Sequence, residues 1–142
     1  FIAFITIAWK YFEYEKVWYY LGLADAYRNL GSFSNARSAV YEALNLKESW
    51  GEAYMNLGNI YVAGAKSCGN DFEQKTVYWI AVDMFNKAQK DESVTSRARK
   101  SINTYSKYFP STEVCFFNNV EKNTKYKIEC WVNKTTTVRT SD

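Results

Sequence analysis

Histidine is absent from this 142-residue chain, and proline and glycine are scarce, with one and six residues respectively. The lack of histidine removes the commonest general base and the commonest protein ligand for metals. The few prolines and glycines argue against a sandwich or barrel of short strands and favour long helices. The length is that of one domain with a sizeable core, and the hydrophobic content of 47% predicts that the chain folds.

Signatures of several kinds of chemistry are also missing. The three cysteines have neither the spacing of a zinc site nor a redox C-x-x-C motif. Residues 64–70, GAKSCGN, lack the residue order of a phosphate-binding loop and the strand that precedes one. The carboxylates on the expected helices form no recognisable catalytic pair. We therefore expect no enzyme activity, no catalytic residues, no metal and no cofactor.

The charge of the chain is mild and uneven. The net charge of +3 is too small to predict a nucleic-acid partner. Residues 1–94 hold 9 Lys and Arg against 11 Asp and Glu, whereas residues 95–142 hold 9 against 4. We interpret the basic C-terminal third as a solvated face. Aromatic residues reach 18%, but they fall where helices would pack on each other, so that packing explains them better than stacking on RNA.

The first nine residues, FIAFITIAW, are apolar but too few to span a bilayer. They also lack the basic flank and the small-residue cleavage site of a signal peptide. We interpret them as the end of a helix whose N-terminal neighbours lie outside this chain. The sequence therefore predicts that the chain is part of a longer protein.

A 34-residue repeat organises the first half of the chain. YYLGLADAYRNLG (19–31) and AYMNLGNIYVAGA (53–65) share large residues at i, i+3 and i+7, which is one face of a helix. Small residues stand where a neighbouring helix would come closest. The pairs with an offset of 34 are Tyr20 and Tyr54, Leu23 and Leu57, Ala24 and Gly58, and Tyr27 and Tyr61.

A second helix follows the first in each unit, but at different distances. In the first unit it is predicted over 32–46, with Ala36, Val40 and Ala43 on one face. The matching residues of the second unit lie 45 rather than 34 residues later, so 11 residues are inserted. SCGND (67–71) lies within this insertion. The matching residues are Ala81, Phe85 and Ala88.

The repeat resembles the tetratricopeptide repeat, a helix–turn–helix unit of the same length. Five positions carry the expected large, small or aromatic residue, and Glu48 replaces the usual proline. The resemblance implies a short helical solenoid over residues 1–110. Its repeats would cover about 17–50 and 51–94, with an inserted loop near 64–75 and a capping helix over about 94–108.

Residues 111–142 follow another pattern. KYKIECWV alternates apolar and polar residues as a strand does, Asn133-Lys134 is a plausible turn, and TTTVRT favours a second strand. We predict a β-hairpin over about 124–140. A lone hairpin is barely stable in water, so this one should pack on the last helices. The predicted fold class is mainly α, a solenoid of helical hairpins with a C-terminal helix and a small antiparallel β-hairpin cap.

The order of these parts sharpens the resemblance. SCGND, VYWIAVDMFNKAQ, a helix ending YFP and YKIECWVNKTTTVR look similar to the C-terminal end of tetratricopeptide-repeat proteins of the Bacteroidota cell envelope. This implies a periplasmic or outer-membrane-associated scaffold without enzyme activity, and a cytoplasmic location stays open. The residues alone leave two alternatives for the cysteines, free buried thiols or a disulfide. The resemblance favours a Cys68–Cys130 disulfide, with Cys115 as a buried thiol.

Surface recognition is the remaining expectation. The first helices of stacked repeats line a concave groove. Asn59 stands where many such repeats hold a peptide backbone, since an amide both donates and accepts hydrogen bonds. Leu21 and Asp25 replace the Lys and Asn of repeats that bind chaperone tails, which argues against that ligand. The expected groove residues are Trp18, Leu21, Asp25, Arg28, Met55, Asn56 and Asn59.

We therefore predict a non-enzymatic scaffold that binds a protein or peptide in this groove, within an envelope complex. The prediction includes no nucleic acid and no direct membrane span. The alternatives are a self-assembling structural subunit and an accessory module of a larger protein. The groove could also be filled by another segment of the chain, and both homo- and hetero-oligomers remain open.

Overall fold

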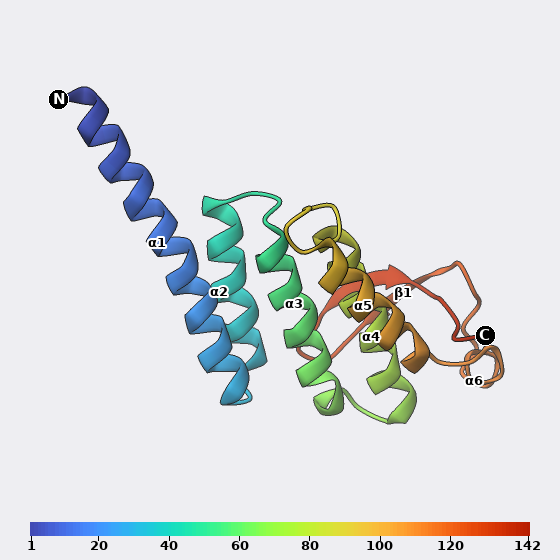
Figure 1. The fold of residues 1–142 in the computed structure, drawn as a ribbon. Helices are drawn as coiled ribbons and strands as arrows, with labels where there is room; N and C mark the ends of the chain where they lie inside the picture. The colour runs from blue at the N-terminus through green and yellow to red at the C-terminus, as the bar shows by residue number, and fades with distance from the viewer.

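The computed structural model describes residues 1–142, and Figure 1 shows a row of helices with a small hairpin behind them. The first five α-helices pack in chain order, each one against the next. The mainly helical fold with a small antiparallel hairpin is thus confirmed. The elements are α1 (Ile2–Asn29), α2 (Phe33–Leu46), α3 (Gly51–Gly64), η1 (Ala65–Ser67), α4 (Asp71–Ala88), α5 (Thr95–Tyr105), η2 (Ser106–Tyr108), α6 (Thr112–Phe117), β1 (Lys125–Ile128) and β2 (Lys134–Thr137).

The residues that define the sequence repeat form the main core. Ala24 and Gly58, the small pair of the repeat, are both buried between helices. A Cβ at Gly58 would lie 2.4 Å from Cε1 of Phe85, so only glycine lets α3 and α4 approach this closely. The second-helix residues are buried in both units, as expected: Ala36, Val40, Ala43, Ala81, Phe85 and Ala88.

The inserted residues mostly lengthen a helix. The helix α4 begins ten residues before Ala81, whereas α2 begins three residues before the equivalent Ala36, so seven of the 11 inserted residues extend α4. The expected loop near 64–75 is therefore largely helical, and only residues 68–70 are irregular. Asn70 ends this stretch with a capping box, because its Oδ1 accepts from the Glu73 N–H while Glu73 Oε2 accepts from the Asn70 N–H.

The hairpin is antiparallel and shorter than predicted. Tyr126 and Ile128 point inward while Lys125 and Lys127 are exposed, so the alternation holds within β1. The strand ends at Ile128, however, and the turn covers 129–133 rather than Asn133-Lys134. Cys130, within this turn, has a left-handed backbone conformation with φ of 53°, and its sulfur is bonded to Cys68.

The segment after the repeats differs in detail from the prediction. The capping helix expected over about 94–108 corresponds to α5, which covers Thr95–Tyr105, and to η2, which continues it to Tyr108. The short helix α6 was not predicted. Its start is fixed by Asp142, whose Oδ1 accepts from the Thr112 N–H at 2.8 Å, and this hydrogen bond lowers the pKa of Asp142.

One end of the molecule stands apart from the core. Figure 1 shows the N-terminal half of α1 leaving the row of helices, and all of residues 1–16 are exposed. Packing on the core begins at Val17, which is 3% exposed. No helix combines the length and the apolar character needed to cross a membrane.

Candidate functional site

Three of the expected groove residues contact one another where α1 and α3 approach. The Asn56 amide donates from Nδ2 to Asp25 Oδ1 at 3.3 Å, and Arg28 Nη2 lies 3.2 Å from the same Asp25 oxygen. Asn59 lies one helical turn beyond Asn56 on α3 and is half-buried. The Oδ1 of Asn56 is buried and accepts from no donor of the protein. These side chains therefore form one polar patch with an unused acceptor.

A second ion pair extends this patch from α3 to α5. Arg97 on α5 contacts Glu52, which lies one turn before Asn56 on α3. The two helix starts are also tied by Asp91, whose Oδ2 accepts from the Gly51 N–H at 2.8 Å. Hydrogen bonds from Ser93 and Gly51 lower the pKa of Asp91. We call the whole patch the polar face: Asp25, Arg28, Glu52, Asn56, Asn59 and Arg97.

An aromatic pair lies beside the polar face. Trp18 is 45% exposed and meets Trp50 edge to face, with ring centroids 4.9 Å apart. Lys47 covers the same Trp50 ring, its Nζ lying 4.8 Å from the centroid. Trp18 is seven residues before Asp25, about two turns along the same side of α1. The exposed part of Trp18 thus adds apolar area next to the polar face.

Two of the expected groove residues lie inside the core instead. Leu21 and Met55 are 4% and 7% exposed. Both side chains pack among the helices because they close the space between α1, α2 and α3. They support the surface from below, and they offer little area to a partner.

The polar face is open rather than a pocket. Five well-formed hollows of the surface measure about 200 to 460 Å³, and none of the seven expected groove residues lines any of them. Sites for small molecules are concave and largely enclosed. The α1–α3–α5 surface is better suited to an extended polypeptide than to a small ligand.

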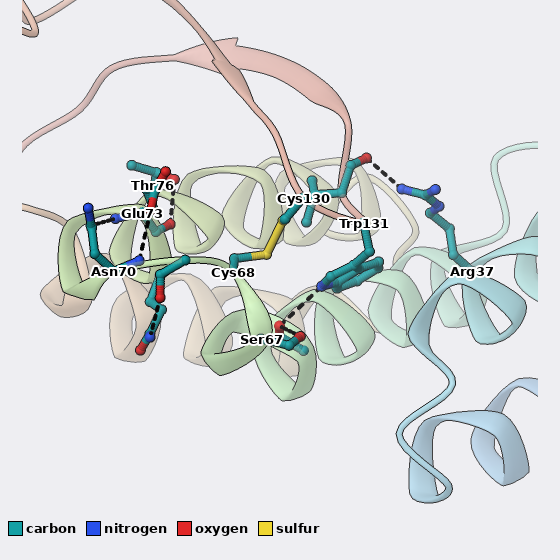
Figure 2. Close-up of a disulfide and its surroundings, with 12 residues drawn as sticks. Arg37, Ser67, Cys68, Asn70, Glu73, Thr76, Cys130 and Trp131 are labelled. Atoms are coloured by element: carbon teal, nitrogen blue, oxygen red, sulfur yellow. Dashed lines mark hydrogen bonds between the residues drawn. A yellow bond between two sulfur atoms is a disulfide. The ribbon is translucent and has the colours of Figure 1, made fainter.

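The expected cysteine pair lies at bonding distance, with Cys68 just after α3 and η1 and Cys130 in the hairpin turn (Figure 2). Cys68 and Cys130 are joined with a Cα–Cα distance of 5.5 Å, and Cys115 is a buried free thiol. Trp131, next to the disulfide, donates from Nε1 to the Gly64 carbonyl oxygen at 3.1 Å. Its ring also packs on Phe33, with centroids 5.4 Å apart. The hairpin turn is therefore fixed to the repeat by a covalent bond and an indole.

A further set of contacts near the end of the chain was not predicted. Trp79 is fully buried and donates from Nε1 to the Arg139 carbonyl oxygen at 2.7 Å, while Arg139 Nη2 donates to the Trp79 carbonyl oxygen at 2.6 Å. Arg139 also pairs with Asp83 at 2.8 Å, and Thr136 bonds the same carboxylate. Thr136 and Arg139 thus anchor β2 and the residues after it on α4.

A hollow of about 400 Å³ lies where the hairpin meets α2, α3 and α4. Lys87 and Lys134 stand at its edge, and the buried Tyr61 forms part of its wall. Burial raises the pKa of Tyr61 to about 12, and Tyr41 acts in the same direction. The hydroxyl of Tyr61 is therefore protonated at neutral pH. It can donate a hydrogen bond but is no nucleophile.

Comparison with known proteins adds no relative. No family model, no curated protein and no solved structure matches the chain. No three His, Cys, Asp or Glu side chains lie together as metal ligands would. The geometry of the α1–α3–α5 surface is thus the observation on which a functional proposal can rest.

Proposed function

We propose that the protein is a non-enzymatic scaffold of tetratricopeptide type that binds an extended segment of another protein across the polar face. The observation that carries this proposal is the Asp25–Asn56 pair. It joins α1 and α3 on an open surface, and 48% of the Asp25 side chain is accessible there. The Asp25 carboxylate can accept from a backbone N–H of a bound peptide, and the second hydrogen of the Asn56 amide can donate to a peptide carbonyl oxygen.

The rest of the surface suits the same ligand. Asn59, one turn further along α3, presents a second amide that can donate to a peptide carbonyl and accept from a peptide N–H. Arg28 is partly exposed, with 26% of its side chain accessible, and its guanidinium can meet an acidic side chain. Trp18 is 45% exposed and packs on the buried Trp50, and it supplies apolar area of the kind that anchors protein interfaces.

We further propose that the scaffold works in the periplasm or at the outer membrane. The support is the Cys68–Cys130 pair, because disulfides form and persist in oxidising compartments and are rare in the cytosol. The resemblance to envelope proteins of Bacteroidota points to the same location.

A displayed library of random peptides tests the binding proposal without a known partner. We expect selected peptides to bind the full chain, and to lose at least tenfold in affinity when Asn56 and Asn59 are both changed to Ala, since two backbone contacts are removed. Asn45→Ala is the matched control, because Asn45 is exposed on α2, a helix that contributes no residue to the polar face.

Calorimetry on the wild type, the double variant and the control would give the affinities directly. If selected peptides bind the double variant as tightly as the wild type, the polar face is not the binding surface. Equal losses in the Asn45→Ala variant would point to a general effect on folding and would also contradict the proposal.

A further inference from the structure

The N-terminal half of α1 is the largest unexplained feature of the molecule. Residues 1–16 lie on α1 or at its start and are all exposed. Soluble monomers rarely expose apolar patches larger than a few hundred Å². Here the exposed large side chains include Phe1 at 98%, Ile2 at 82%, Phe4 at 80%, Ile5 at 56%, Ile7 at 67%, Trp9 at 65%, Tyr11 at 66%, Phe12 at 60% and Tyr14 at 57%.

These apolar side chains surround the helix rather than form a stripe. Eight of the first nine residues are apolar, and successive residues are about 100° apart around an α-helix. The one exception, Thr6, donates its hydroxyl to the Ile2 carbonyl oxygen at 2.9 Å. A groove or a single partner helix would cover only one side of such a helix. An apolar medium covers all sides, and it tolerates a hydroxyl that is bonded within its own helix.

Polarity changes along the axis of the helix, from its tip toward the protein. Residues 1–9 carry no charged side chain, and Lys10 is the first. Trp9, Tyr11 and Tyr14 lie on both sides of Lys10 within about one and a half turns, and tryptophan and tyrosine are enriched where hydrocarbon meets water in membranes. Lys16 ends this band just before the core begins at Val17. The order is that of hydrocarbon, interface and water.

We propose that residues 1–9 insert into the hydrocarbon layer of a lipid membrane, with the aromatic residues at 9–14 at its surface. This inference is independent of the polar face, which lies further along α1 and on α3 and α5.

Vesicle flotation of the full chain with its disulfide intact tests this proposal. For this experiment the α-amino group of Phe1 is acetylated, since a charged α-ammonium group would oppose insertion. We expect the protein to float with neutral phosphatidylcholine vesicles at high salt, because insertion depends on apolar side chains. Lipids labelled with a doxyl quencher should suppress the fluorescence of Trp9, because Trp9 is the tryptophan nearest the membrane. The Trp9→Phe variant should therefore lose most of this quenching.

A matched pair of variants locates the contact. Ile5→Asp places a charge within the inserted segment and should reduce partitioning about tenfold or more. Leu30→Asp places the same charge on a residue that is 79% exposed at the other end of α1, and it should float like the wild type. Circular dichroism checks that both variants keep the helical fold.

Three results would overturn the proposal. The protein could stay in solution with neutral vesicles and float only with vesicles that contain phosphatidylglycerol at low salt, which would indicate adsorption by its basic C-terminal third. Leu30→Asp could lose binding as much as Ile5→Asp does. Finally, lipid-free protein could form an oligomer that Ile5→Asp dissociates and that does not float, in which case a second copy covers the helix.

Discussion

The two ends of the chain are attached to the same helical core in opposite ways. Residues 1–16 are rich in large apolar side chains, and all of them are exposed. The hairpin strands are made mostly of lysine and threonine, yet Ile128 and Thr136 are buried against the core. A disulfide, the Trp131 indole and the partly exposed Arg139, which bonds Trp79 and Asp83, hold the hairpin in place. Composition alone would have predicted the reverse.

The difference shows that burial depends on having a partner of matching shape. The α1 segment has apolar groups on every side, but α2 begins to pack on it only near Val17. The hairpin has few apolar groups, but they pack against side chains of the helical core. Trp131, for example, packs on Phe33 and on Tyr61, and its indole N–H finds the carbonyl oxygen of Gly64. The contribution of each attachment to the free energy of unfolding can be measured separately.

Reduction of the disulfide should have the largest effect. The bond closes a loop with a sequence separation of 62, so its loss should lower the free energy of unfolding by about 4 kcal/mol in the chain-entropy treatment. Urea titrations with and without dithiothreitol measure this change. A Cys68→Ala, Cys130→Ala variant serves as control and should not respond to the reductant. Equal midpoints for oxidised and reduced wild type would show that the other contacts hold the hairpin alone.

Removal of the Trp131 side chain should have the next largest effect. Trp131→Ala leaves a hole between Phe33 and Tyr61 and should cost about 3 kcal/mol, the low end for tryptophan because the side chain is half-buried. Trp131→Phe keeps a ring and loses the hydrogen bond to Gly64, so about 1 kcal/mol is expected. Thermal unfolding of both variants gives the order. A Phe variant as unstable as the Ala variant would contradict the stacking role.

A pair of glycines should respond to the same substitution with opposite signs. A Cβ on Gly64 would lie 2.4 Å from Cζ2 of Trp131 and 2.9 Å from Cγ of Phe33, so Gly64→Ala should destabilise by about 2 kcal/mol. Gly22 on α1 has nothing within 4 Å of its Cβ position, and Gly22→Ala should stabilise by roughly 0.5–1 kcal/mol through helix propensity. Urea unfolding of both variants tests the contrast. Stabilisation by both would show that Trp131 and Phe33 can move to make room for a methyl group at position 64.

The repeat core could be predicted from the sequence because its signal is periodic. The 34-residue offset located the helices, and the equivalent alanines are buried in both units. The cysteine pairing came from a resemblance, since three cysteines allow several arrangements. The placement of the expected groove residues could be predicted only in part, because helical spacing puts Asp25 and Arg28 on one side of α1 but does not show that Leu21 turns inward.

The remaining features depend on long-range contacts that leave little local signal. The Trp79–Arg139 pair joins residues 60 positions apart, and neither residue is unusual in its own segment. The Glu52–Arg97 pair on the polar face is similar, although Glu52 lies one turn before Asn56 and could have been suspected on that ground. The short helix α6 did leave a signal, because Ser111 stands at its N-cap and accepts from the Val114 N–H.

The smallest effect is expected from the exposed half of α1, and it completes the comparison with Trp131. Trp9 is 65% exposed, and the nearest ring, that of Phe12, belongs to its own helix. Trp9→Ala should therefore change the free energy of unfolding by less than about 0.5 kcal/mol in dilute, lipid-free solution. Urea unfolding measures this, with sedimentation to confirm that the protein is monomeric. A loss above about 1 kcal/mol would mean that residues 1–16 pack on the body of the protein, because an exposed side chain without partners has nothing to lose. The contrast between the two ends of the chain would then fail.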